Sequence, residues 1–74
     1  MDKDTELKAL GHHIQLVRKQ KGMTQVQLAH ALGKDQQSIQ RLEAGNVNPT
    51  YFYLLEIAEG LGVSIGDLVR VNHD

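Results

Sequence analysis

The sequence has no cysteine and a single proline in its 74 residues. Without cysteine the chain has neither disulfides nor a thiolate metal cluster, so packing or a partner subunit must stabilise a core that is limited by size. No apolar run approaches the roughly 18 residues that a membrane span requires, and the acidic, polar N-terminus does not resemble a signal peptide. We therefore expect one small, soluble, cytoplasmic domain with no membrane contact.

The chain also lacks the groupings that catalysis or metal binding would need. No Ser/His/Asp arrangement, phosphate-binding glycine loop or pair of inward carboxylates can be drawn from it. His12 and His13 are adjacent, so they point to different faces of a helix, and no carboxylate stands beside them at metal-ligand spacing. We expect no enzyme activity, no metal and no cofactor.

The net charge of −1 is unlike that of a uniformly basic nucleic-acid-binding protein. The charge is unevenly distributed, however. Residues 18–45 carry five basic and two acidic residues, a net +3, whereas residues 1–17 and 46–74 have net charges of −1 and −3. This pattern concentrates positive potential on one region of the surface and leaves the rest to repel non-specific polyanions.

Hydrophobic periodicity and capping residues predict five helices and no strand. The first predicted helix ends near Gly22. Its apolar stripe consists of Leu7, Leu10, Ile14 and Val17. The other predicted helices cover residues 25–32, 36–44, 49–61 and a short segment after residue 64. Their predicted caps are Thr24 (with Gln27 as a capping box), Asp35 and Ser64, and Pro49 is expected at or near the first position of the fourth helix. We expect an all-α, five-helix bundle at residues 10–69, with residues 1–9 as an extension that continues into the first helix and 70–74 as a tail.

The second and third predicted helices form a helix-turn-helix unit. In DNA-binding proteins this unit places its second helix in the major groove. Gly33 supplies the permissive backbone of the turn, Ala29 is small enough for the two helices to approach, and Ile39 anchors the second from beneath. The pattern therefore presents residues 36–44 as a candidate recognition helix.

The outward face of that helix carries Gln36, Gln37, Gln40 and Arg41. Glutamine can pair with adenine and arginine with guanine through two hydrogen bonds, and each good pair discriminates by about 1 to 3 kcal/mol. A row of glutamines also suits an ordinary solvated helix face. The helix-turn-helix setting favours a base-reading surface.

Several short motifs resemble those of the Cro/C1-type helix-turn-helix family, also called the Xre family, of phage repressors and small bacterial regulators. In order they are Arg18-Lys19-Gln20-Lys21-Gly22-Met23-Thr24-Gln25, Leu28-Ala29, Leu32-Gly33, Gln36-Gln37-Ser38-Ile39, Leu42-Glu43-Ala44-Gly45, Asn48-Pro49-Thr50 and Ile57-Ala58. The resemblance covers about residues 10–68, and its Gln-Gln-Ser-Ile run is similar to the start of the recognition helix in a lambdoid phage repressor. It implies a lambda-repressor-like fold and a bacterial or phage-encoded, nucleoid-associated regulator that binds double-stranded DNA.

The resemblance also implies roles for single residues. Gln36, Gln37 and Arg41 match the principal base-contacting positions, and Gln40 is a neighbouring candidate. Gln25 matches a residue that meets the DNA backbone and supports the recognition helix. Further backbone-contacting candidates are Arg18, Thr24, Lys34, Ser38, Asn46 and Asn48.

Arg18 and Glu43 match an ion pair between the first and third helices. Glu43 would hold the guanidinium at the surface edge, where it can also face a phosphate, and the structural and phosphate roles are equally open. Asp35 departs from the family, whose members usually have Ser or Thr at this cap, and places a negative charge near DNA. The neutral loop at residues 46–50 predicts a shallow salt dependence of binding.

Three consecutive aromatic residues, Tyr51, Phe52 and Tyr53, cannot all be buried on one helix. We expect Tyr51 to pack inward and one of the other two to be exposed. Exposed aromatics are typical of subunit interfaces, and a locally covered surface aromatic is equally open. The candidate homodimer residues are Phe52, Tyr53, Ile65, Val69 and Val71.

The prediction is a homodimeric, sequence-specific regulator, with repression favoured, on a palindromic operator. Two recognition helices would then enter successive major grooves about 34 to 36 Å apart. Alternatives with the same fold are an antitoxin or a restriction-system controller, with a toxin or polymerase as protein partner. A different alternative is a protein-interaction module with little DNA binding, which the charge asymmetry does not favour.

Overall fold

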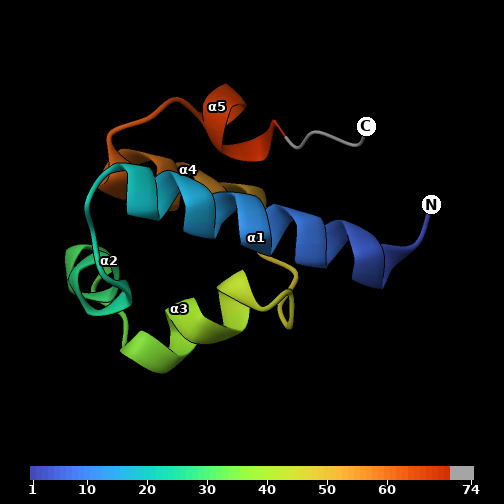
Figure 1. Cartoon of the computed structure of the whole chain (residues 1–74), viewed down its shortest axis with the longest axis horizontal. Helices are drawn as coiled ribbons and strands as arrows, with labels where there is room; N and C mark the ends of the chain where they lie inside the picture. The colour runs from blue at the N-terminus through green and yellow to red at the C-terminus, as the bar shows by residue number, and fades with distance from the viewer. Residues whose placement is uncertain (71–74) are drawn as a thin grey trace.

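A computed structural model describes residues 1–70 and contains five α-helices and no strand in that range (Figure 1). The helices are α1 (Lys3–Gln20), α2 (Gln25–Leu32), α3 (Gln36–Glu43), α4 (Tyr51–Leu61) and α5 (Ile65–Val69). The predicted all-α, five-helix fold is confirmed. The candidate recognition helix ends one residue earlier than predicted, because Ala44 serves as its C-terminal cap.

Side-chain caps fix where the helices begin. Thr24 and Gln27 form the predicted capping box, with hydrogen bonds of 3.0 and 2.8 Å, and Asp35 and Ser64 cap α3 and α5 as predicted. Pro49, expected at or near the first position of the fourth helix, lies two residues before its first residue, Tyr51. Thr50 has extended backbone and accepts the Tyr53 N–H at 3.0 Å, so it caps α4 and Pro49 precedes the cap.

Helix α1, with 18 residues, is the longest element and begins at Lys3. Asp2 caps it by accepting the backbone N–H of Thr5, and its first turns extend beyond the other helices in Figure 1. Most of residues 1–9 therefore continue α1 as helix. Within residues 1–70, no helix combines the length and hydropathy required to cross a bilayer.

One core joins all five helices. Its buried members are Ile14, Val17, Leu28, Ala29, Ile39, Leu42, Ile57, Ala58, Leu61 and Leu68. Helix α3 packs against α1 and α2, α4 packs against α2 and α5, and α5 packs against α1. Because α3 is anchored on two sides, its orientation depends on both neighbours.

Two glycines allow α1 to lie directly on the C-terminal end of α3. A Cβ at Gly11 would meet the backbone oxygens of Leu42 and Glu43, the latter at 2.6 Å. A Cβ at Gly45 would lie 2.6 Å from the Cα of Lys8. This backbone-to-backbone contact leaves no room for a side chain, so it fixes the end of the candidate recognition helix.

Candidate nucleic-acid interface

Helix α3 presents the four predicted base-reading side chains to solvent. Gln36, Gln37, Gln40 and Arg41 are all exposed, while Ile39 and Leu42 are 0% and 1% exposed and anchor the helix from beneath. In Figure 1, α3 lies at the edge of the bundle opposite α5. Nothing in the described part of the chain covers this amide-rich face.

A buried ion pair holds α3 to α1. The Arg18 Nε donates to Glu43 Oε2 at 2.6 Å and Nη2 donates to Oε1 at 3.0 Å, with side-chain exposures of 7% and 2%. The third nitrogen, Nη1, donates to the carbonyl oxygen of Met23 at 2.7 Å. Hydrogen bonding to Glu43 raises the pKa of Arg18, although burial alone would lower it.

The expectation that this guanidinium lies at the surface edge was wrong. Each of its three nitrogens already donates within the protein, and the α1–α3 packing encloses it. This geometry favours the structural role of Arg18 over a contact with phosphate.

The ion pair continues as a chain of amides to the surface. Gln25 Nε2 donates to Glu43 Oε1 at 3.0 Å, and Gln36 Nε2 approaches Gln25 Oε1 at 3.5 Å. The buried charge pair thereby restrains Gln25 and, through it, the first side chain of α3. Side chains held before binding lose less conformational entropy when they contact a ligand.

The other backbone-contacting candidates lie on two flanks of α3. Thr24 stands at the start of α2, next to Gln25, and is exposed. On the opposite flank, Lys34, Ser38 and Asn48 line a pocket of about 430 Å³ between α3 and α4, together with Arg41, Tyr53 and Glu56. We call this the α3–α4 pocket. Asn46 is exposed in the loop that follows α3.

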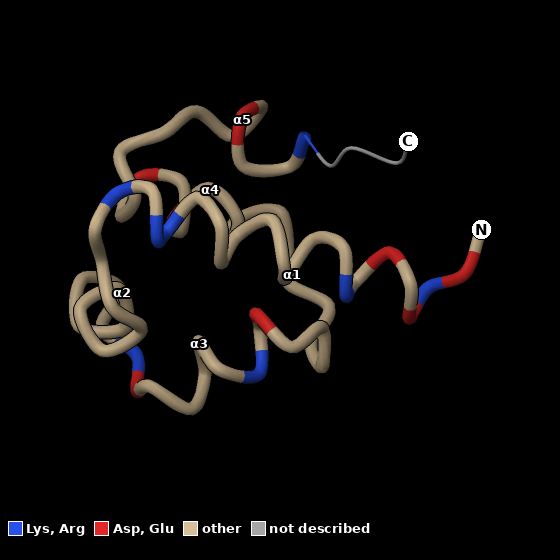
Figure 2. Tube along the Cα trace, viewed as in Figure 1, with Lys and Arg blue, Asp and Glu red and all other residues tan. Residues whose placement is uncertain are grey.

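The charges are arranged as the sequence indicated. In Figure 2 most of the charge at the start of α1 is acidic and lies at one extremity, the other end of α1 is basic, and each end of α3 carries one basic and one acidic residue. Asp35 is the acidic residue at the start of α3, where it accepts both the N–H and the hydroxyl of Ser38. These hydrogen bonds hold the pKa of Asp35 below its usual value, so this negative charge beside the candidate interface persists at neutral pH.

The aromatic cluster divides differently from the prediction. Tyr51 is 66% exposed and does not pack inward, because the buried residues of α4 begin only at Ile57. Phe52 is 69% exposed. Tyr53 is half-buried against the core and lines the α3–α4 pocket, a position that the spacing of three adjacent aromatics does not reveal. Of the other predicted interface residues, Ile65 is half-buried, Val69 is exposed and Val71 lies outside the described residues.

Comparison with known proteins agrees with this geometry. The family described as helix-turn-helix (HTH_3) matches residues 14–68. The HTH-type transcriptional regulator y4dJ of Sinorhizobium fredii (strain NBRC 101917 / NGR234), itself uncharacterized, is 40% identical over 62 residues, which make up 84% of this chain and 80% of that protein.

Two solved structures show the same arrangement of helices. The restriction-modification controller protein C.AhdI from Aeromonas hydrophila matches with a TM-score of 0.82 at 26% identity, over 86% of this chain and 97% of that one. The controller protein C.Esp1396I, solved as a tetramer in complex with its natural 35 base-pair operator, matches with a TM-score of 0.74 at 30% identity, over 88% and 96% of the two chains. The chain belongs to the helix-turn-helix family of Cro/C1-type (Xre) DNA-binding transcriptional regulators.

Proposed function

We propose that this protein is a homodimeric repressor that reads a palindromic operator with α3. The observation that carries the proposal is the exposed face of Gln36, Gln37, Gln40 and Arg41, whose first side chain, Gln36, meets the Arg18–Glu43–Gln25 chain. A rigid helix with long amide and guanidinium side chains suits the width and the hydrogen-bonding edges of the major groove. Bound at a promoter, such a dimer excludes polymerase without chemistry of its own.

A restriction-modification controller is the second candidate. Both solved relatives described above bear that name, and C.Esp1396I was solved on its operator. A controller would use the same α3 face, so the two candidates differ in the genes that they regulate and not in the interface.

The base-reading assignment predicts a loss of sequence preference when α3 is truncated. Gln37→Ala and Arg41→Ala should each weaken binding to the selected operator by about 1 to 3 kcal/mol and relax the preference at one base pair. Duplex selection followed by titration of single-base variants measures both effects.

Gln20→Ala is the matched control for these variants. Gln20 is an exposed amide that lines a groove between α1 and α5, away from α3, so its loss should change neither affinity nor preference. Unchanged binding in both α3 variants would overturn the assignment. Failure of the wild-type protein to retain any duplex would favour a protein-interaction module.

Dimer formation should depend on Phe52. It is the more exposed of the two large apolar side chains at the start of α4, and aromatic anchors dominate interface energies, at about 2 kcal/mol or more for a hot spot. Phe52→Ala is expected to raise the dimer dissociation constant at least about tenfold, as measured by sedimentation at several concentrations. Val26→Ala, which shortens an exposed apolar residue on α2, should have no effect, and equal dissociation in both variants would refute this interface.

A further inference from the structure

The carboxylate of Asp35 lies at the N-terminal end of α3 and uses only one of its two oxygens. Oδ1 accepts the backbone N–H and the hydroxyl hydrogen of Ser38, each at 2.8 Å, and so caps the helix. Within residues 1–70, no group donates a hydrogen bond to Oδ2. Because two hydrogen bonds fix Oδ1 and the side chain is exposed, Oδ2 is a positioned acceptor that faces solvent.

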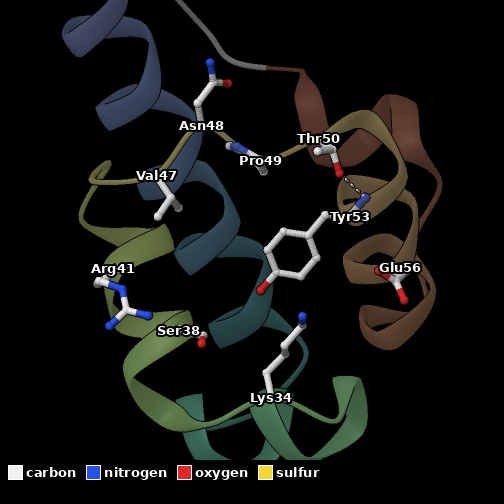
Figure 3. Close-up of a pocket in the computed structure, with 9 residues that line it drawn as sticks. All are labelled: Lys34, Ser38, Arg41, Val47, Asn48, Pro49, Thr50, Tyr53 and Glu56. Atoms are coloured by element: carbon white, nitrogen blue, oxygen red, sulfur yellow. Dashed lines mark hydrogen bonds between the residues drawn. The ribbon is translucent and has the colours of Figure 1, made fainter.

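No cation among the described residues forms an ion pair with this carboxylate. Lys34 directly precedes Asp35, but its ammonium lies over the ring of Tyr53, 5.3 Å from the centre (Figure 3). Hydrogen bonds from Ser38, with a smaller contribution from the charge of Arg41, hold the pKa of Asp35 below its usual value. The free oxygen therefore belongs to an ionised group at neutral pH.

The N-terminal end of a recognition helix is the part that contacts base edges in the major groove. Asp35 directly precedes Gln36 and Gln37, the first two side chains of the amide-rich face, and like them it is exposed. A duplex engaged by α3 therefore brings Oδ2 close to a base edge.

Few groups in a duplex can stabilise this oxygen. An ionised carboxylate accepts hydrogen bonds and cannot donate them, so phosphates and the acceptor edges of guanine and thymine repel it. The donors in the major groove are the N6 amino group of adenine and the N4 amino group of cytosine. Adenine presents its amino group beside the acceptor N7, whereas cytosine has no acceptor on its major-groove edge. Cytosine is the base that suits a carboxylate best.

We infer that Asp35 determines specificity for a C·G base pair, with Oδ2 accepting a hydrogen bond from the N4 amino group of the cytosine. This inference rests on the proposed function, because it assumes that α3 enters the major groove. It adds a fifth base-reading side chain to the four amide and guanidinium side chains of α3. The same negative charge disfavours duplexes that offer no amino group at this position.

Asp35→Asn tests the inference by exchanging an acceptor for a donor in a side chain of the same shape. The cap requires the amide oxygen to face the Ser38 N–H, so the NH₂ group takes the place of Oδ2. Duplex selection should recover cytosine at one operator position with the wild type, and guanine or thymine there with the variant. Titration of the single-base duplexes should show that the wild type prefers cytosine about tenfold or more and that the variant reverses this order.

Asp35→Ser separates base reading from helix capping. Serine caps helices about as well as aspartate does, so the melting temperature should stay close to that of the wild type. The preference at this one base pair should disappear, whereas the preference that depends on Gln37 should remain. Both Asp35 variants remove a negative charge beside the duplex, so each should bind unrelated duplexes more tightly.

Asp67→Asn is the matched control for the change in charge. It neutralises an exposed carboxylate on α5, at the edge of the bundle opposite α3. Surface charges are screened over about 8 Å at physiological ionic strength, so this variant should leave the base preference unchanged.

Three results would overturn the inference and leave the proposed function intact, provided that Gln37→Ala still alters the sequence preference. Tighter binding of every duplex by both Asp35 variants, with the base preference unchanged, would show that the carboxylate only repels phosphates. A lower melting temperature of Asp35→Ser with unchanged preference would show that it only caps the helix. A wild-type preference for a base other than cytosine, at the position that Asp35→Ser relaxes, would contradict the amino-group contact. Failure of the wild type to retain any duplex would instead remove the proposed function, and this inference with it.

Discussion

Replacing Glu43 by alanine is expected to lower the free energy of unfolding by about 3 to 5 kcal/mol. Glu43 is the carboxylate partner of Arg18, and both side chains are enclosed between α1 and α3. Without it, two of the three guanidinium nitrogens lose their acceptors inside a space that excludes water. The cost of an uncompensated buried charge exceeds that of an ordinary large-to-small substitution at the surface. Urea unfolding followed by circular dichroism measures the change.

A double variant separates two contributions to this loss of stability. One is the loss of the ion pair itself, and the other is the cost of leaving one buried charge without a partner. Arg18→Met with Glu43→Leu replaces both partners with apolar side chains of similar length, and buried pairs replaced in this way are often neutral or even stabilising. We expect its stability to return close to that of the wild type. A loss below about 1 kcal/mol in Glu43→Ala alone would instead mean that the pair behaves like a solvent-exposed salt bridge.

The same double variant also asks whether the pair serves DNA binding. Gln25 would lose the oxygen that restrains it, and Gln36 would lose its ordered neighbour. We therefore expect weaker binding to the operator even where stability is restored. Restored stability together with wild-type affinity would show that the chain of amides does not prepare the interface.

Local rules were enough to predict the helices from the sequence. The capping box at Thr24, the caps at Asp35 and Ser64 and the glycines that end α2 and α4 each involve residues within about one turn of one another. Interactions at such short range depend little on tertiary packing. The outward direction of the four α3 side chains followed in the same way from Ile39 and Leu42 on the opposite face.

Features that join distant segments of the chain could not be predicted from the sequence. The burial of Arg18 depends on α3, 25 residues away along the chain, which closes over it. The spacing of three adjacent aromatics predicts that their side chains point in different directions from the helix. It does not predict which of the three packs against another helix. Tyr53 is half-buried because α4 packs against α2, and its pocket draws on residues from Lys34 to Glu56 that are far apart in the sequence.

Gly45→Ala is expected to cost roughly 2 to 5 kcal/mol of stability, more than its backbone conformation alone would explain. Gly45 has a φ of +80°, which an L-residue adopts at a cost of about 1 to 2 kcal/mol. In addition, the new Cβ would lie 2.6 Å from the Cα of Lys8 and 2.8 Å from its backbone nitrogen. Neither atom belongs to a flexible side-chain end, so α1 itself would have to shift, and overpacking of this kind costs about 1 to 3 kcal/mol more.

Gly62→Ala isolates the conformational part of that cost. Gly62 has a similar φ of +71° at the end of α4, but a Cβ there would meet no atom within 4 Å. Its loss should stay near 1 to 2 kcal/mol, so the difference between the two variants in urea unfolding measures the α1–α3 contact. Because α1 also carries Arg18, a shift at Gly45 should disturb the pairing with Glu43 and weaken operator binding, whereas Gly62→Ala should leave it unchanged. Equal losses of stability in the two variants would show that α1 can shift at little energetic cost. The end of α3 would then be held by its side-chain contacts instead of by this close backbone approach.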